Sequence, residues 1–367
     1  MTKAKTKAAA PTGEHAAEVS QLRILDPDGT LIGEPPKIEE ERLGEMLRLM
    51  MLGRRFDQKA IALQRRGKLG TYPPMSGQEA ASVGSAFAMD PTIDHFVPSY
   101  REQLIMVHWG LPFSRYLLQR MGHPAGSVIP DHGRLWPQQV ALAAHLPHAV
   151  GLAWGLKLQD REGVVMTHFG DGASNEGDFH EALNIAGVRK APVIFICQNN
   201  GWAISIPWER QSAAASVADR AAGYGFPGVA VDGNDVLAVY TATADARARA
   251  AAGGGPTLIE ARTTRLGAHS TADDPTRYVP PEWLEDATRR DPIARFRTWL
   301  TSQNMWDDDR EKAAEQWCDD FMEQAIQEYD DTPKPDPEQL FDHLLAERGT
   351  RLQRQRDDFV ANRETDG

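Results

Sequence analysis

The chain has 367 residues and a formal net charge of −12, with 41% hydrophobic and 25% charged residues, the composition of a globular protein with a well-buried core. Residues 1–280 carry 28 basic and 29 acidic side chains, whereas residues 281–367 carry 12 and 23. A nearly neutral body with an acidic tail excludes the clustered basic face of a nucleic-acid-binding or membrane-binding protein. Two cysteines, Cys197 and Cys318, cannot form a disulfide framework, and no apolar run approaches the roughly 20 residues of a membrane span. We therefore expect a cytoplasmic protein.

The first half of the sequence predicts an arm followed by helices. Residues 1–36 hold a basic, Ala-rich stretch without the apolar segment of a signal peptide, and then turn-rich pieces. Residues 39–66 predict a helix that Gly67 ends, and the S-x-x-E spacing of Ser76 and Glu79 predicts a capping box for a helix over 80–89. The Ala- and Gly-rich segment 138–158 predicts a helix that packs tightly in the core or lets a ligand approach closely.

Strands and helices alternate from residue 164 onward. Strands are expected at 164–169, 193–197, 229–232 and 257–262, with helices at 175–190 and 235–252. This alternation predicts an α/β fold with a doubly wound, mainly parallel sheet. A polar loop then leads at about residue 281 into acidic helices. We expect three regions, namely a flexible arm over 1–36, a main domain over 37–300 and an acidic helical region over 301–367.

Polar residues follow two of the predicted strands. Gly170-Asp171-Gly172-Ala173 ends the first, and Asn199-Asn200-Gly201-Trp202 follows the second. One crossover helix and one strand separate Asp171 from Asn200, so both should reach the same edge of the sheet, where ligands of such folds bind. Carboxylate and amide oxygens suit magnesium, and the helix start near 175–177 offers free N–H groups to phosphate oxygens. Each motif alone is typical of a turn, but together they predict a magnesium-bound diphosphate.

Longer motifs extend this interpretation. GDGASNEGDFHEALN, APVIFICQNNGWAIS, PSYRE and GAHSTADDPTRY resemble the alpha subunit of the decarboxylating component of thiamine-diphosphate-dependent 2-oxo acid dehydrogenases. RRGKLGTYPPMSGQEA, DGNDVLAVY, GPTLIEA and DPIARFRTWL match that family's landmarks in order, so the similarity runs from about residue 67 to 300. The resemblance implies a thiamine-diphosphate-binding fold with an N-terminal arm and C-terminal helices.

The resemblance also implies a role for each matching position. Magnesium would be bound by Asp171, Asn200 and the backbone carbonyl of Trp202. Thiamine diphosphate would be contacted through its diphosphate or its aminopyrimidine ring by Tyr100, Arg101, Leu142, Gly172, Ala173, Gln198 and His269. His269 would in addition be a catalytic residue that aids reductive acylation.

Some positions depart from the family's pattern. Val140, Ala144 and His145 replace the Ser and Thr-Gln residues that surround the cofactor helix in branched-chain relatives, so we expect no potassium site. Thr71 stands where an aromatic residue often lines the substrate pocket, which leaves the size of the substrate open. Ser270 lies where mitochondrial relatives are phosphorylated, and we expect no kinase for it.

The implied activity is oxidative decarboxylation of a 2-oxo acid with transfer of the acyl group to the lipoyl group of an acyltransferase partner. No Glu matches the cofactor-activating residue, which the family takes from a beta subunit, so we expect an α2β2 heterotetramer. The loop 268–274 favours a branched-chain substrate of the 3-methyl-2-oxobutanoate type, whereas 67–74 and 212–222 favour the alternative, a pyruvate dehydrogenase; an acetoin dehydrogenase is a further alternative. The remote alternatives are a magnesium–nucleotide enzyme, which would lack both phosphate-binding glycine motifs, and a non-catalytic scaffold.

Overall fold

The computed structural model describes residues 20–130, 133–342 and 344–365, so most of the predicted arm over 1–36 lies outside the described residues. The part of this arm that is described runs along the edge of the body. Leu22 forms a parallel bridge with Val231, and the backbone N–H groups of Ile24 and Leu25 both donate to Oδ2 of Asp235 at 2.7 Å. Residues 20–25 therefore cover the outer edge of the sheet.

A five-stranded sheet with the order β1-β2-β3-β7-β6 forms the centre of the fold, and every neighbouring pair is parallel. Its strands are β1 (His95–Val97), β2 (Val165–Gly170), β3 (Val193–Asn199), β6 (Gly228–Asp232) and β7 (Thr257–Arg262). A small antiparallel hairpin, β4 (Trp202–Ala203) with β5 (Ile206–Pro207), follows β3. The predicted doubly wound α/β fold is confirmed. Within the central sheet the sequence missed β1, which is too short to show a pattern, and the β4–β5 hairpin was not predicted either.

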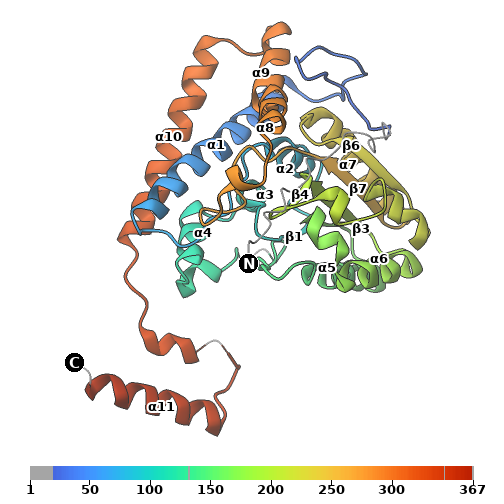
Figure 1. Cartoon of the computed structure of the whole chain (residues 1–367). Coiled ribbons are helices and arrows are strands. Elements are labelled where there is room, and N and C mark those ends of the chain that lie inside the picture. The colour runs from blue at the N-terminus through green and yellow to red at the C-terminus, as the bar shows by residue number, and fades with distance from the viewer. Residues whose placement is uncertain (1–19, 131–132, 343, 366–367) are drawn as a thin grey trace, which may run out of the picture.

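Helices cover both faces of this sheet (Figure 1). On one face α5 (His145–Leu158) and α6 (Gly177–Arg189) pack against β1, β2 and β3. On the other face lie α2 (Glu79–Phe87), α3 (Gln103–His108) and α7 (Val236–Ala251), with α1 (Glu40–Arg65) packed outside α2. Helices α4 (Phe113–Arg120), α8 (Pro281–Arg289), α9 (Pro292–Ser302) and α10 (Asp308–Asp331) complete the body.

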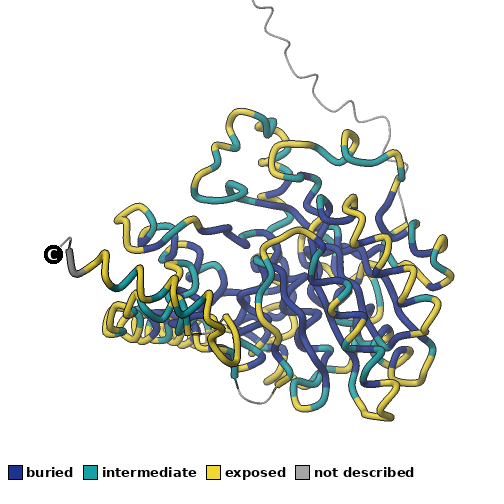
Figure 2. The backbone as a smooth tube through the Cα atoms, turned by 90° about the horizontal axis from the view of Figure 1, so that it is seen from below, coloured by how far each residue is buried: buried dark blue, intermediate teal, exposed yellow. Residues whose placement is uncertain are grey.

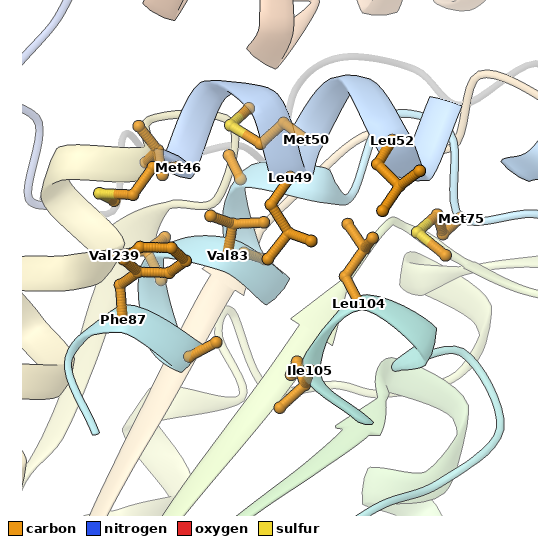
Figure 3. Close-up of a cluster of buried hydrophobic side chains, with 14 of the residues drawn as sticks. Met46, Leu49, Met50, Leu52, Met75, Val83, Phe87, Leu104, Ile105 and Val239 are labelled. Atoms are coloured by element: carbon orange, nitrogen blue, oxygen red, sulfur yellow. The ribbon is translucent and has the colours of Figure 1, made fainter. Parts of the chain in front are cut away.

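Alternate strand residues supply the two halves of the core. Ile194 and Ile196 of β3 face the α1–α2 side, where Met46, Leu49 and their neighbours pack on α2, α3 and α7 (Figure 3). Phe195 and Cys197 of the same strand face α5 and α6. Figure 2 shows that the buried residues concentrate in the sheet and the helices beside it. Such two-sided burial explains why the strands read as continuous apolar runs.

Two local expectations are wrong. Ser76 does not cap α2, because its hydroxyl bonds Oδ2 of the buried Asp57 at 2.5 Å; the helix begins at Glu79, whose own Oε2 accepts from the N–H of Gly77. The segment 138–144 is irregular and ends in a turn over 142–144, where Ala143 has φ 60°, and α5 begins only at His145. Both corrections reshape the wall of the cavity described below.

The C-terminal part ends in a further helix, α11 (Thr350–Thr365), which lies within the predicted helical region 301–367. It lies apart from the body, joined to α10 by an extended stretch (Figure 1). Phe341 and Phe359 pack together within this segment, with ring centroids 5.6 Å apart. Of the helices in the described ranges, none combines the length and the apolar character needed to cross a bilayer.

Candidate active site

A cavity of about 590 Å³ opens at the carboxyl ends of β2 and β3, beside the β4–β5 hairpin. In the β2–β3 register Gly170 pairs with Gln198, so the residues that follow each strand emerge next to one another. Every site residue implicated by the sequence lines this one cavity, namely Tyr100, Arg101, Leu142, Asp171, Gly172, Ala173, Gln198, Asn200, Trp202 and His269. The predicted meeting of Asp171 and Asn200 at one edge is therefore found.

Asp171 is the buried carboxylate of this cavity, with only 1% of its surface exposed. It opens a short 3-10 helix (Asp171–Asn175) directly after β2, and its Oδ2 accepts a hydrogen bond from Nε2 of Gln211 at 2.7 Å. Burial raises its pKa to about 6, although the Gln211 bond opposes this. No basic side chain of the described residues forms an ion pair with it. A buried anion of this kind is stabilised by a bound cation.

Amide and carbonyl oxygens stand beside that carboxylate. Nδ2 of Asn200 donates to Oε1 of Gln78 at 3.2 Å, and the backbone N–H of Trp202, which can only donate, fixes which end of the Asn200 amide is the oxygen. Oδ1 of Asn200 accepts from the N–H of Trp202 at 3.2 Å and keeps a second lone pair. Across the described stretches no three His, Cys, Asp or Glu residues cluster in a way that could hold a metal. A cation at Asp171 would thus depend on amide, carbonyl and ligand oxygens, the set that magnesium prefers.

Arg101 supplies the complementary charge. Arg101 is 7% exposed, and its guanidinium donates to the backbone oxygen of Pro74 and, through Nη2, to the backbone oxygen of His269 at 3.1 Å. Among the described residues no carboxylate pairs with it, so a buried cation faces the same cavity as the buried anion Asp171. Arg120 adds a second guanidinium to the wall and donates to the backbone oxygen of Tyr100 at 3.0 Å. This arrangement fits an anionic ligand that carries its own cation.

His269 is held as a neutral imidazole. Nη2 of Arg101 lies 3.2 Å from its Nδ1, and because a guanidinium only donates, Nδ1 accepts and the ring proton sits on Nε2. Burial, together with the charges of Arg101 and Arg265, lowers the pKa of His269 to about 4. Its backbone N–H donates to Oδ2 of Asp273 at 2.7 Å, and the hydroxyl of Tyr278 donates to the same oxygen. The loop thus fixes both the position and the tautomer of the ring.

The glycine-rich turn lets the hairpin come close. A Cβ on Gly172 would lie 2.9 Å from the Cβ of Ala203, so only glycine permits β4 to approach here. Ala173 is buried behind it, whereas Leu142 stands at the mouth of the cavity with 45% of its surface exposed. Tyr100 lies edge-on to His269, with ring centroids 6.4 Å apart. These residues shape the wall around the two charged groups.

Two cavity residues were quoted in motifs without being assigned a role. Glu102, in PSYRE, is 2% exposed and lines the cavity beside Arg101; burial raises its pKa to about 7. Gln78, in the S-x-x-E motif, has a buried Nε2 without a hydrogen-bond partner among the described residues. A polar residue inside a motif that already contains a recognised Arg or Glu does not stand out in the sequence. The position of Glu102 and Gln78 in the cavity wall was therefore visible only in the structure.

Comparisons with known proteins agree with this site. The family model of the dehydrogenase E1 component matches residues 47–338. The chain belongs to the dehydrogenase E1 component family. The protein named pyruvate dehydrogenase E1 component subunit alpha in Staphylococcus epidermidis is 38% identical over 345 residues, covering 93% of each chain. Its namesake in Bacillus cereus is 41% identical over 322 residues, covering 87% of this chain and 86% of the relative, and that of Staphylococcus aureus is 39% identical over 321 residues with the same coverage.

Family membership makes this protein an enzyme component of the 2-oxo acid dehydrogenase E1 type, with thiamine diphosphate as the implied cofactor. It confirms the resemblance found in the motifs and favours a dehydrogenase over both a nucleotide enzyme and a scaffold. The names of the relatives do not support the branched-chain expectation and favour its alternative, the pyruvate type. E1 alpha subunits generally work with a beta subunit and a complex core.

Proposed function

We propose that this chain is the alpha subunit of a pyruvate dehydrogenase of the acetyl-transferring type, and that its cavity binds magnesium and thiamine diphosphate. The observation that carries this proposal is that two buried side chains of opposite charge line the same cavity without forming an ion pair with each other. Arg101 and Asp171 line one cavity, and neither has an oppositely charged side-chain partner within the described residues. A magnesium-bound diphosphate compensates both charges at once.

Magnesium would be held by Asp171, the amide oxygen of Asn200 and the backbone carbonyl of Trp202. All three residues line the cavity, and the bond from the N–H of Trp202 fixes the orientation of the Asn200 amide. A magnesium ion that is bound by only two protein side chains usually completes its coordination with phosphate and water oxygens. The cation would favour the ionised form of Asp171, because it compensates the charge that burial disfavours.

The cofactor's other contacts follow from the same wall. Arg101 would bind the diphosphate, with Tyr100, Gly172, Ala173 and Gln198 around it, while Leu142 at the mouth would support the aminopyrimidine ring. When bound, thiamine diphosphate supplies the electron sink for loss of carbon dioxide from a 2-oxo acid. His269 keeps its proton on Nε2, where it can donate to an oxygen of the reacting group, and Arg101 keeps that tautomer.

The partners are proposed from the family and from the rim of the cavity. Val140, Leu142 and Ile204 line the mouth, and 62%, 45% and 56% of their surfaces are exposed. Exposed apolar residues around a catalytic cavity suit a protein surface that completes the site. A beta subunit in an α2β2 heterotetramer would cover this rim and bring the activating glutamate, and the acyl group would pass to the lipoyl domain of an acyltransferase component.

Steady-state rates would test this proposal. The chain, reconstituted with its beta-type partner, magnesium, thiamine diphosphate and a lipoyl acceptor, is assayed with pyruvate and with 3-methyl-2-oxobutanoate. We expect the higher kcat/KM with pyruvate and no activity from the chain alone. A preference for the branched-chain acid would refute the pyruvate assignment, and activity without the partner would refute the shared site.

A further inference from the structure

A buried chain of side chains leads from the cavity into the core. Nε2 of Gln198 donates to Oε1 of Glu102 and to Nδ1 of His168, both at 3.1 Å. His168 in β2 then lies 3.0 Å from Oγ of Ser85 through its Nε2, and Ser85 donates to the backbone oxygen of Ala81 at 2.8 Å. Glu102, Gln198, His168 and Ser85 are all at most 3% exposed.

In this arrangement the network leaves no amide proton of Gln198 for an anion in the cavity. Both amide protons of Gln198 are used inside the network, and its Oε1 has no partner within the described residues. Gln198 lines the cavity wall beside Gly172 and Ala173, where the diphosphate is proposed to lie. An amide oxygen repels phosphate oxygens, whereas an amide N–H would bond them.

A second arrangement of the same atoms reverses this. If Glu102 takes up one proton and the Gln198 amide turns over, Oε1 of Gln198 accepts from the new O–H of Glu102 and from Nδ1–H of His168. The imidazole stays neutral and exchanges its Nε2–H for Nδ1–H, and the hydroxyl of Ser85 donates to Nε2. Every donor again meets an acceptor, and the amide NH2 of Gln198 becomes free for the cavity.

We propose that Glu102 is a positioning residue for the cofactor, which takes up one proton from solvent when the diphosphate binds and so turns the Gln198 amide from acceptor to donor. This rests on the proposed function, because it requires a diphosphate in this cavity. The proton balance is simple: one proton enters at Glu102, and the His168 tautomer changes without net gain.

The surrounding charges determine the pH at which this proton uptake can be measured. Arg101 opposes protonation of Glu102, but burial outweighs it and brings the pKa to about 7, so the carboxyl is mostly ionised at pH 8 before the cofactor binds. His168 stays neutral there, since burial lowers its pKa to about 3. The other charged or titratable groups on the cavity wall are Tyr100, Arg120, Asp171, Glu176 and His269. At pH 8 Asp171 and His269 hold the same charge before and after binding.

Calorimetry on the assembly that contains this chain would test the proposal. Magnesium–thiamine diphosphate is titrated at pH 8 in buffers of different ionisation enthalpy, which yields the number of protons taken up per cofactor. We expect nearly one proton for the wild-type protein. Glu102→Gln, whose amide N–H imitates the protonated carboxyl, should show no uptake and bind about tenfold more tightly at this pH. Glu176→Gln removes another carboxylate of the same cavity and should keep the wild-type uptake.

Several results would overturn it. Binding by the wild-type protein without proton uptake, or equal uptake in Glu102→Gln, would refute the role of Glu102 and leave the proposed function standing. Absence of binding by the wild-type protein would refute the proposed function itself. A second measurement uses the wild-type protein and so does not depend on the folding of a variant. Infrared difference spectra of the protein labelled with ¹³C-glutamate at pH 8 should gain a protonated-carboxyl band when the cofactor binds. The absence of this band would also refute the proposal.

Discussion

Nη2 of Arg101 lies 3.2 Å from Nδ1 of His269 and 3.1 Å from the backbone oxygen of the same residue. One guanidinium therefore fixes the tautomer of the histidine, the position of its loop and the positive charge of the cavity. The two residues lie 168 positions apart in the sequence, and the loop 72–76 stands next to both, since Arg101 also donates to the backbone oxygen of Pro74.

Replacing this guanidinium should remove the anion-binding charge. We expect Arg101→Met to weaken the binding of magnesium–thiamine diphosphate about a hundredfold or more, because hydrogen bonds to charged groups contribute up to about 3 kcal/mol. Fluorescence or calorimetric titration of the reconstituted assembly measures the change. Arg289→Met, at a side chain that is 77% exposed, is the matched control and should bind as the wild type does. Equal affinity in both variants would contradict a diphosphate at Arg101.

The loop 72–76 depends on Asp57 of α1. Its carboxylate accepts from the N–H groups of Met75 and Ser76, at 2.9 and 2.7 Å, and from the hydroxyls of Tyr72 and Ser76. Asp57→Asn turns one acceptor into a donor that faces donors, so we expect it to lower the free energy of unfolding by about 2–4 kcal/mol.

Chemical denaturation compares this variant with Asp319→Asn. Asp319 of α10 pairs with Arg55 of α1, but the Asp319 side chain is 38% exposed, so its loss should cost less than about 1 kcal/mol. Similar costs for the two variants would show that the buried carboxylate does not hold the loop.

Buried neutral histidines make stability depend on pH. His145 is 1% exposed, its Nε2 donates to the backbone oxygen of His168 at 2.7 Å, and burial lowers its pKa to about 4. The unfolded chain therefore binds more protons than the folded one between pH 4 and the ordinary value of 6.5. Stability should rise with pH across this window and fall on acidification.

His145→Gln should lessen the loss of unfolding free energy between pH 7 and pH 5 by about 2 kcal/mol, since an amide can keep the bond to His168 without titrating. Denaturation curves at both values measure it. His148→Gln, at an exposed position of the same helix, should keep the wild-type loss. An unchanged pH dependence in His145→Gln would mean that this imidazole is not kept neutral by the fold.

The sequence predicted the parts of this molecule that depend on periodicity and on strand ends. Apolar runs identified the strands that precede Asp171 and Asn200. Because parallel strands bring their carboxyl ends to one edge of a sheet, the sequence alone predicted that these two residues lie close together. Gly172 was expected as a contact of the cofactor, and the structure shows that it also lets Ala203 approach closely.

Contacts made across the fold could not be predicted in this way. Ser76 has the spacing of a helix cap, but its hydroxyl donates a hydrogen bond to the carboxylate of Asp57, 19 positions earlier in the sequence. Glu102, Gln198 and His168 belong to three separate elements, and their meeting depends on strand register and on the position of the segment before α3. Local propensity carries no information on such partners, which decide the polar part of the site.

The central claim is that Asp171 and Arg101 together hold a magnesium-bound diphosphate. The most direct measurement is the calorimetric titration of the αβ assembly with magnesium–thiamine diphosphate for Asp171→Ala and for Asp178→Ala, an exposed carboxylate in the first turn of α6. We predict that Asp171→Ala weakens binding at least about a hundredfold and that Asp178→Ala binds as the wild type does. Unchanged binding in Asp171→Ala would contradict the claim.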